Sequence, residues 1–190
     1  MSEKTSDPTS RKDRIKSIPE IAVRLEAASD QSAVFRVTAA AFGREKEARL
    51  VDALRVSDAF VPELSLVAEK DGTIAGYILF TKVEFTRDPS HRGLAIGPVS
   101  VAPDMQKLGI GAELIKTGIG KARKLGFDSV ILLGHPEYYP RFGFVPASNW
   151  NITTSYNAPN ATFALELRQG ALDHTAGEAR YAKEFALNGC

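Results

Sequence analysis

A strand-like run that passes through a glycine-containing turn into a helix is the feature that most constrains this sequence. The apolar run from 94 to 101 is closed by Pro103-Asp104, and a helical pattern follows Gly109. Gly109 and Gly111 stand where the first N–H groups of a helix have no partner inside that helix. Glycine lets a ligand approach the main chain closely, and the helix dipole favours an anion at this end. The turn is therefore a candidate diphosphate site, to which Lys107 would add charge.

Two other phosphate-binding loops do not fit this stretch. The dinucleotide-binding pattern requires glycine at the position of Leu114, and the kinase-type P-loop requires a Gly-Lys-Ser/Thr sequence that does not occur here. The alternative is a tight strand-to-helix turn that binds no ligand, and a lone Gly-x-Gly would favour that alternative. The interpretation of this turn as a diphosphate site therefore needs support from the rest of the sequence.

The surrounding pattern predicts alternating strands and helices. Strands are expected at 21–25, 64–69, 74–85, 94–101, 128–133 and 162–167, and helices at 30–41, 44–56, 109–125 and near 138–142. Asp71-Gly72 between two strand-like runs predicts a hairpin. The strand–loop–helix–strand run over 94–133 has the length of a βαβ unit with a parallel pair. The tail from 170 to 190 is polar and weakly patterned.

Composition and charge exclude several classes of function. The 24 Lys and Arg nearly balance the 23 Asp and Glu, so the net charge of +1 creates no general field for nucleic acid or an anionic membrane. The single cysteine, Cys190, excludes a disulfide framework and a cysteine-rich metal site, and is typical of a reducing compartment. The first twenty residues have no apolar segment of the secretory kind. We therefore expect a cytoplasmic protein with a disordered polar tail at 1–18.

Two motifs in the expected order carry a resemblance to a known family. Gln106-x-x-Gly109-x-Gly111 is similar to the Gln/Arg-x-x-Gly-x-Gly/Ala signature of the GNAT family of N-acetyltransferases, together with the strand before it and the helix after it. Further along, Tyr139-Pro140-Arg141-Phe142-Gly143-Phe144 resembles the Tyr-x-x-x-Gly-Phe of that family. The run from about 21 to 185 resembles its bacterial YhbS-like branch. Two motifs at the right separation are much more specific than either alone.

The resemblance implies an α/β domain with the GNAT fold. In that fold the central sheet is mixed and mostly antiparallel, one parallel strand pair is splayed, and helices cover both faces. The implied N-acetyltransferase domain spans 19–168. Residues 169–190 would form a C-terminal extension that is packed on the domain or trails from it.

The resemblance also implies acetyl-coenzyme A (acetyl-CoA) as a co-substrate. The main chain of the splayed strand would pair with the pantetheine arm as with an added strand, and the N–H of Val99 would polarise the acetyl carbonyl. The N–H groups of the glycine turn would hold the diphosphate. The implied cofactor-binding residues are Pro98, Val99, Ser100, Val101, Gln106, Lys107, Leu108, Gly109, Ile110, Gly111, Ala112 and Tyr139.

Tyr139 is the candidate proton donor, because it stands four residues before Gly143, where the family tyrosine faces the cofactor thiol. The resemblance implies that it protonates the departing thiolate. The alternative is a buried ring whose hydroxyl is merely satisfied, and Tyr138 is the neighbour that could be confused with it. Many family members place an asparagine and a longer helix before this tyrosine. Here 135–137 leads straight to it, which puts the usual asparagine contact with pantetheine in doubt.

Glu63 is the candidate general base, because it precedes a central strand where a carboxylate could face the acceptor. Its alternative is an ordinary solvated residue. Glu69 and Glu84 are further options, but strand alternation places them on an exposed face. His135 follows a strand near the expected thiol, although a loop histidine is more often structural or solvated. His91 and His174 are expected to be uninvolved, and no metal site is expected.

The implied reaction is direct attack of a primary amine on the thioester in a ternary complex. The acceptor, a small molecule or a protein amine, cannot be read from the sequence, and a homodimer is left open. Trp150 and Tyr156 could line the acceptor pocket or anchor their loop. The alternative function is a non-catalytic acyl-CoA sensor with the same fold. A third interpretation, an N-terminal tail that binds nucleic acid or ribosomes, has weak support, so we expect neither a nucleic-acid nor a membrane partner.

Overall fold

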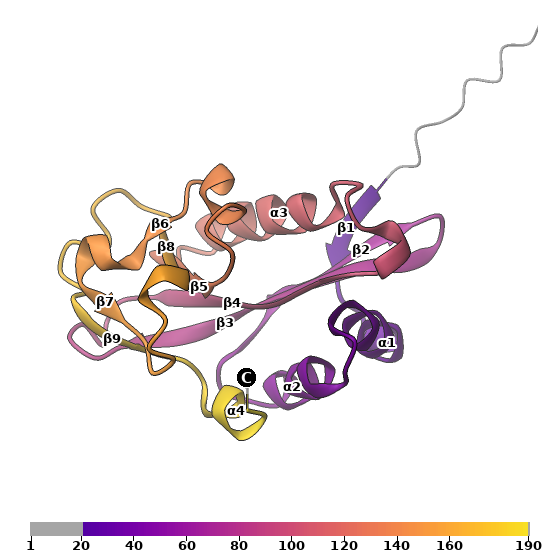
Figure 1. The fold of residues 1–190 in the computed structure, drawn as a ribbon, viewed down its shortest axis with the longest axis horizontal. Helices are drawn as coiled ribbons and strands as arrows, with labels where there is room; N and C mark the ends of the chain where they lie inside the picture. The colour runs from indigo at the N-terminus through magenta and orange to yellow at the C-terminus, as the bar shows by residue number, and fades with distance from the viewer. Residues whose placement is uncertain (1–20, 190) are drawn as a thin grey trace, which may run out of the picture.

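The computed structural model describes residues 21–189 (Figure 1). The predicted tail at 1–18 and Cys190 lie outside the described residues. The helices and strands follow in the order β1 (Ile21–Leu25), α1 (Gln31–Phe42), α2 (Lys46–Arg55), β2 (Phe60–Lys70), β3 (Thr73–Phe85), β4 (Gly93–Val101), α3 (Ile110–Lys124), β5 (Ser129–Leu133), β6 (Val145–Pro146), β7 (Ile152–Thr153), β8 (Thr162–Glu166), β9 (Gly177–Arg180) and α4 (Lys183–Leu187). Short 3-10 turns occur at η1 (Ala28–Asp30), η2 (Pro103–Met105), η3 (Tyr139–Phe142), η4 (Ala147–Trp150) and η5 (Pro159–Ala161).

The sheet is mixed and mostly antiparallel, as the resemblance implied. Its strands lie in the order β1-β2-β3-β4-β5-β8-β6, and β9 joins at the end of β3. The central parallel pair is β4 with β5, which meet over only three residue pairs, from Gly93 opposite Ser129 to Ala95 opposite Ile131. After Ala95 the two strands separate, while β4 stays paired with β3 as far as Val101. The splayed parallel pair of the predicted fold is therefore confirmed.

Helices cover both faces of the sheet (Figure 1). On one face α3 buries its apolar side, including Leu114, Ile115 and Ile119, against the central strands. On the other face α1 and α2 pack Val34, Leu50 and other apolar residues against Tyr77 and Leu79 of β3. The apolar spacing in each helix matches the 3.6-residue helical period, which explains why each helix buries one stripe.

Two local predictions are confirmed at positions where the main chain is left-handed. The hairpin between β2 and β3 turns at Asp71 and Gly72, whose φ angles are 50° and 73°, as a primed two-residue turn requires. Helix α3 is preceded by Gly109 at φ 86° and is followed after Leu125 by Gly126 at φ 76°. Glycine adopts these angles without the steric penalty of a β-carbon.

The weakly patterned residues 170–189 contain two elements that the sequence pattern did not predict. Residues 177–180 form β9, which pairs with the end of β3 and with β7, and 183–187 form α4. Leu172, Ala179 and Phe185 are buried. The sequence Gly-Glu-Ala-Arg of β9 shows no apolar alternation, and α4 is far shorter than a helix that is stable alone, so tertiary contacts form both elements. Strand β2 also begins four residues earlier than predicted, through a register irregularity between Phe60 and Ser65.

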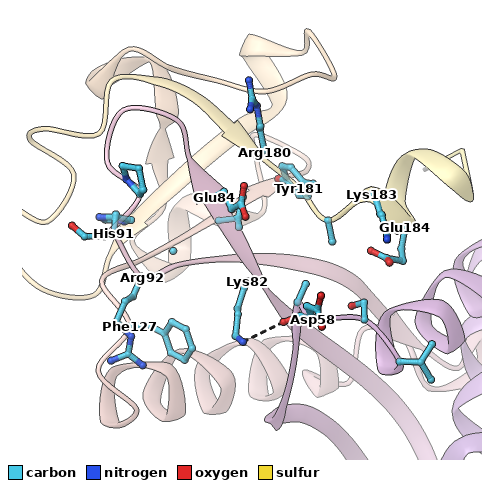
Figure 2. A pocket seen from close by; sticks show the side chains of 18 residues that line it. Asp58, Lys82, Glu84, His91, Arg92, Phe127, Arg180, Tyr181, Lys183 and Glu184 are labelled. Atoms are coloured by element: carbon cyan, nitrogen blue, oxygen red, sulfur yellow. Dashed lines mark hydrogen bonds between the residues drawn. The ribbon is translucent and has the colours of Figure 1, made fainter.

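His91 lies in the loop before β4, where its ring is buried rather than solvated (Figure 2). Its Nε2 lies 2.6 Å from the Ser129 hydroxyl, and its ring packs edge-on against Phe85 at 4.4 Å between centroids. Burial lowers the pKa of His91 below its ordinary 6.5, although the carboxylates of Asp128 and Asp88 oppose the shift. The folded state therefore favours the neutral form of the His91 imidazole.

We expect His91 to make stability fall as the pH drops below about 6.5. The unfolded chain binds a proton to this histidine at a higher pH than the folded chain, so acid favours unfolding. Denaturant unfolding between pH 7.5 and 5.5 should show this slope, and His91→Gln should flatten it. His174→Gln, at an exposed position, is the control that should leave the slope unchanged. An equal slope in His91→Gln and the unaltered chain would contradict the assignment.

Candidate active site

The gap between β4 and β5 is the centre of the candidate site. Beyond Ala95 the edge of β4 that faces β5 has no strand partner among residues 21–189, although its other edge continues along β3. A cavity of about 440 Å³ opens there, lined from β4 by residues 96–99 and from the β5 side by Leu133, Gly134 and His135. An unpaired strand edge can accept an extended ligand as an additional strand. Pro98, Val99, Ser100 and Val101 all belong to this free stretch of β4.

The glycine turn follows at the end of β4. Lys107 and Gly109 both have left-handed φ angles, 64° and 86°, and no side chain caps the start of α3. The first N–H groups of a helix have no partner within it, and here Ile110, Gly111 and Ala112 occupy those positions. Lys107, Leu108 and Gly109 are exposed. An exposed turn with uncapped N–H groups and a helix dipole behind them fits an anionic group such as diphosphate.

Two side chains border this turn. Gln106 bends back so that its Nε2 donates to the carbonyl of Val101 at 3.3 Å, which ties the turn to the end of β4. A β-carbon on Gly111 would lie 3.4 Å from the Tyr138 hydroxyl and 3.6 Å from Val101. Tyr138 is half-buried and stacks under the Arg141 guanidinium, at 4.6 Å from carbon to ring centroid. Tyr138 therefore faces the glycine turn.

Tyr139 points in a different direction from its neighbour. The two rings are perpendicular, with centroids 5.2 Å apart, and Tyr139 lines the cavity between β4 and β5. Its ring lies so close to Gly134 that a β-carbon there would be 2.0 Å from Cε2. Burial, with a smaller contribution from Tyr138, raises the pKa of Tyr139 to about 12. The two neighbouring tyrosines therefore have different surroundings, with Tyr138 at the glycine turn and Tyr139 in the cavity.

The carboxylates that the sequence singled out do not line this cavity. Glu63 is exposed on β2, at the irregular stretch where pairing with β3 is interrupted, so the expectation that it faces the acceptor is not supported. Glu69 accepts a hydrogen bond from Arg24 at 2.9 Å. Glu84 is exposed and borders a different cavity. Of the remaining candidates, His135 and Tyr156 line the cavity, whereas Trp150 does not.

Glu47 is the carboxylate that the structure places in the cavity lining. It lies on the buried side of α2 with Leu50 and Leu54, and Arg44 holds it through both carboxylate oxygens. The Arg44 guanidinium keeps the pKa of Glu47 below its ordinary value, against the opposing effect of burial. The sequence contained one signal for this residue, namely an acidic side chain on the apolar stripe of a helix.

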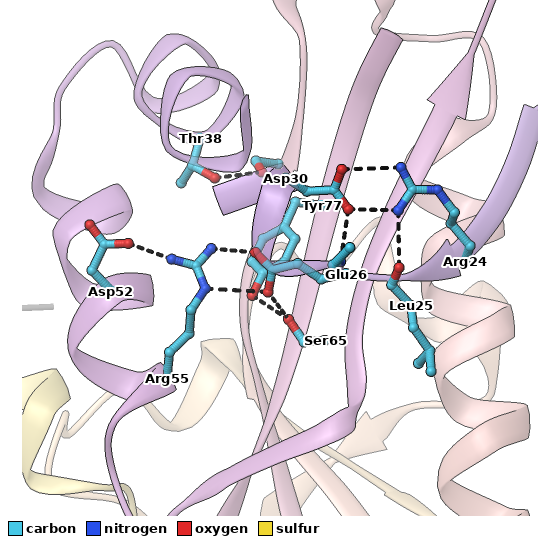
Figure 3. A network of polar contacts seen from close by, with 11 residues as sticks. Arg24, Leu25, Glu26, Asp30, Thr38, Asp52, Arg55, Ser65 and Tyr77 are labelled. Carbon is cyan, nitrogen blue, oxygen red and sulfur yellow. Dashed lines mark hydrogen bonds and ion pairs between the residues drawn. The ribbon is translucent and has the colours of Figure 1, made fainter. Parts of the chain in front are cut away.

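A buried polar network fixes the helix that carries Glu47 (Figure 3). At the other end of α2, Arg55 Nη2 donates to Glu26 at 2.5 Å, and Glu26 accepts from the Ser65 hydroxyl at 2.6 Å. Ser65 in turn lies 2.8 Å from the Tyr77 hydroxyl on β3. A buried ion pair with its remaining sites satisfied constrains geometry, because each partner is costly to leave alone. Helix α2 is therefore held against β2 and β3.

A second, larger cavity of about 640 Å³ lies at the C-terminal end of β3 (Figure 2). Asp58, Lys82, Glu84, Arg92 and Arg180 bring charges of both signs to its rim. It reaches neither the glycine turn nor the gap between β4 and β5, and its wall shares only Tyr181 with the first cavity. Its volume alone does not make it the catalytic site.

Two further observations concern residues 21–189. Over this span no helix combines the length and the apolar character needed to cross a bilayer. The histidines, aspartates and glutamates of the same span form no group of three or more that could hold a metal ion.

A mixed sheet that splits after its parallel pair, beside an uncapped glycine turn, defines the class of the N-acetyltransferase fold. The model of the acetyltransferase (GNAT) family matches residues 32–144, and this chain belongs to that family. The resemblance seen in the two sequence motifs is thereby confirmed.

Individual relatives agree with this assignment. The uncharacterised N-acetyltransferase YjhQ of Escherichia coli is 41% identical over 121 residues, which cover 63% of this chain and 67% of YjhQ. The structure of E. coli YhbS in complex with CoA has a TM-score of 0.82 at 23% identity, covering 96% of each chain. A GNAT acetyltransferase from Brucella melitensis in complex with acetyl-CoA has a TM-score of 0.72 at 33% identity, covering 87% of this chain and 98% of the other.

Proposed function

We propose that this protein transfers an acetyl group from acetyl-CoA to a primary amine by direct attack in a ternary complex. The observation that carries the proposal is the free edge of β4, which runs from an uncapped glycine turn to a cavity containing Tyr139. The choice of co-substrate is supported by the two similar structures described above, which are complexes with CoA and with acetyl-CoA. Membership of the GNAT family supports the reaction class.

In this proposal each part of the chain has one task. The N–H groups of residues 107–112 hold the diphosphate, and the main chain of Pro98 to Val101 binds the pantetheine arm. The N–H of Val99 polarises the thioester carbonyl. The deprotonated amine nitrogen forms a bond to the carbonyl carbon, and the carbon–sulfur bond breaks. Tyr139 donates its proton to the departing thiolate and is reprotonated by the proton that the nitrogen loses as the amide forms, so that the products are an amide and free CoA.

Removal of the proton from the incoming ammonium needs a base or a chain of water. Glu63 is the sequence candidate for this base, but it is exposed on β2 and does not line the cavity. Glu47 lines the cavity, but Arg44 lowers its pKa and so makes it a weak base. The proposal therefore assigns proton removal to water and leaves Glu47 a binding role.

Tyr139 leads to a prediction about pH. Because burial raises the pKa of Tyr139 to about 12, its hydroxyl keeps its proton throughout the neutral and mildly alkaline range. We expect kcat to keep rising with pH up to about pH 10, because a primary alkyl ammonium loses its proton only near that pH. A pH profile at saturating substrates measures this. A descending limb between pH 8 and 10 would contradict the role of Tyr139 as the acid.

The proposal is tested by measuring thiol release from acetyl-CoA with a panel of primary amines. We expect release to depend on the amine and an acetylated amine to form in equal amount. The alternative is a sensor that binds acyl-CoA without chemistry. In that case calorimetry would detect binding of acetyl-CoA, but no amine would release thiol above the background rate, and the proposed function would be wrong.

A further inference from the structure

The cavity next to Tyr139 has a wall whose chemistry indicates what enters it. Its outer part is built by α1, α2 and the C-terminal segment, which all lie on the face of the sheet opposite α3 (Figure 1). The side chains on this wall are mostly apolar or aromatic, namely Phe42, Leu50, Pro98, Tyr156, Tyr181 and Phe185. Its volume of about 440 Å³ is within the usual range of small-molecule sites.

A continuous stack of aromatic side chains joins the loop between β7 and η5 to the C-terminal segment. Tyr156 packs edge-on against Tyr181, with centroids 5.3 Å apart, and Tyr181 packs in the same way against Phe185 at 5.2 Å. Phe185 reaches β4, since a β-carbon on Gly97 would lie 3.1 Å from its ring. This stack forms part of the lining of the cavity. It offers a buried apolar surface to the part of the acceptor beyond its nitrogen.

Glu47 supplies the only carboxylate among the residues described in this lining. Its side chain is 9% exposed, whereas that of Arg44 is 60% exposed, so the guanidinium approaches from the solvent side. A carboxylate has about four acceptor positions, and Arg44 Nε and Nη2 make three contacts with the two oxygens of Glu47, which leaves room for a further donor. The lowered pKa keeps Glu47 negative. It can therefore accept hydrogen bonds from an ammonium group while it remains paired with Arg44.

Charge also limits the kind of amine that can be bound. A polyamine would bring two or more ammonium groups into a wall that has one carboxylate, and an unpaired buried charge is costly. An amine with a polar arm would lose water against the apolar side chains of the wall, where the Tyr181 hydroxyl, buried without a hydrogen-bond partner among the described residues, could replace only part of its hydrogen bonds. An amine with one charge and an apolar arm satisfies both parts of the wall.

We propose that the acceptor is a primary amine on a single aryl or alkyl arm, with its ammonium bound by Glu47 and its arm against the aromatic stack. This inference rests on the proposed function and specifies its substrate class. The same chemistry could come from a free amine or from the apolar N-terminal residue of a peptide. The experiment below separates these two sources.

The test is the kcat/KM for thiol release with four acceptors, at saturating acetyl-CoA. These are 2-phenylethylamine, ethanolamine, spermidine and a short peptide that begins with phenylalanine. We expect 2-phenylethylamine to exceed ethanolamine and spermidine at least about tenfold, because burial of a phenyl-sized arm contributes a factor of this order. If the peptide exceeds 2-phenylethylamine, the inference stands and the source is an apolar N-terminal residue.

Two variants test the two halves of the wall separately. Glu47→Gln should lower kcat/KM for 2-phenylethylamine by about tenfold or more, mainly through KM, because a charged hydrogen bond is lost. Glu45→Gln is the matched control, since Glu45 lies next to the same helix, 56% exposed and outside the lining. Phe42→Ser should reduce the preference for 2-phenylethylamine over ethanolamine, measured as the ratio of the two kcat/KM values. Phe42 is 41% exposed, so its truncation should not disturb the fold.

Failure of this inference differs from failure of the proposed function. If spermidine or ethanolamine is the better acceptor, or if Glu47→Gln behaves like Glu45→Gln, the inference is wrong while the acetyltransferase activity stands. If acetyl-CoA binds but no amine releases thiol, the proposed function falls, and the inference falls with it.

Discussion

Tyr139→Phe is expected to lower kcat more than tenfold while the affinity for acetyl-CoA stays almost unchanged. The substitution removes only the hydroxyl proton that we assign to the departing thiolate. The ring should stay in place, because it packs against Gly134 and lies edge-on to Phe144 with centroids 5.9 Å apart. Steady-state rates with the best amine of the panel and calorimetry with acetyl-CoA measure the two quantities.

Tyr138→Phe is the matched control for this experiment. Tyr138 is adjacent in sequence, but its hydroxyl lies beside Gly111 at the glycine turn instead of in the cavity. We expect this variant to retain kcat within about twofold. Any effect of the substitution should be limited to the affinity for acetyl-CoA. The reverse result, a loss of kcat in Tyr138→Phe and none in Tyr139→Phe, would show that the proton donor has been assigned to the wrong tyrosine.

Gly118→Ala is expected to destabilise the protein by about 3 kcal/mol, since overpacking a filled core has costs of this order. A β-carbon on Gly118 of α3 would lie 2.2 Å from the ring of Phe80 on β3. Phe80 is fully buried and cannot move away without disturbing its neighbours. For a domain of this size the loss corresponds to a fall in Tm of about 6–12 °C, which calorimetric or optical melting would detect.

Gly120→Ala provides a control with the opposite sign. Gly120 lies two residues further along α3, and a β-carbon there would meet nothing within 4 Å. Alanine in a helix interior is more favourable than glycine by roughly 0.5–1 kcal/mol, so Tm should rise slightly. If both variants lowered Tm equally, a cause other than the contact with Phe80 would control stability here.

The parts of the fold that could be predicted from sequence are those in which neighbouring residues determine the structure. The turn at Asp71 and Gly72 and the glycine before α3 are local, because a left-handed main chain favours these residue types wherever they stand. The apolar stripe of α3 is also local. The splayed parallel strand pair was predicted from the family motifs. No local sequence pattern could have indicated that the two strands separate.

The walls of the candidate site could not be predicted in the same way. Phe185 reaches Gly97 from almost ninety positions away, through β9 and α4, whose own sequences are too short and too polar to signal structure. Glu63 was favoured because it precedes a strand, but the irregular register of β2 leaves its side chain exposed. Glu47 was missed because its position depends on how α2 packs, and the Arg55–Glu26 pair helps to fix that packing.

The account depends most on the claim that the N–H groups of residues 107–112 bind the diphosphate of acetyl-CoA. A crystal structure of the protein with acetyl-CoA tests this claim directly. We predict that diphosphate oxygens lie about 2.7–3.2 Å from those nitrogens and that the pantetheine arm follows β4 beyond Ala95. A complex in which the turn is capped by its own side chains and the cofactor lies elsewhere would contradict the account.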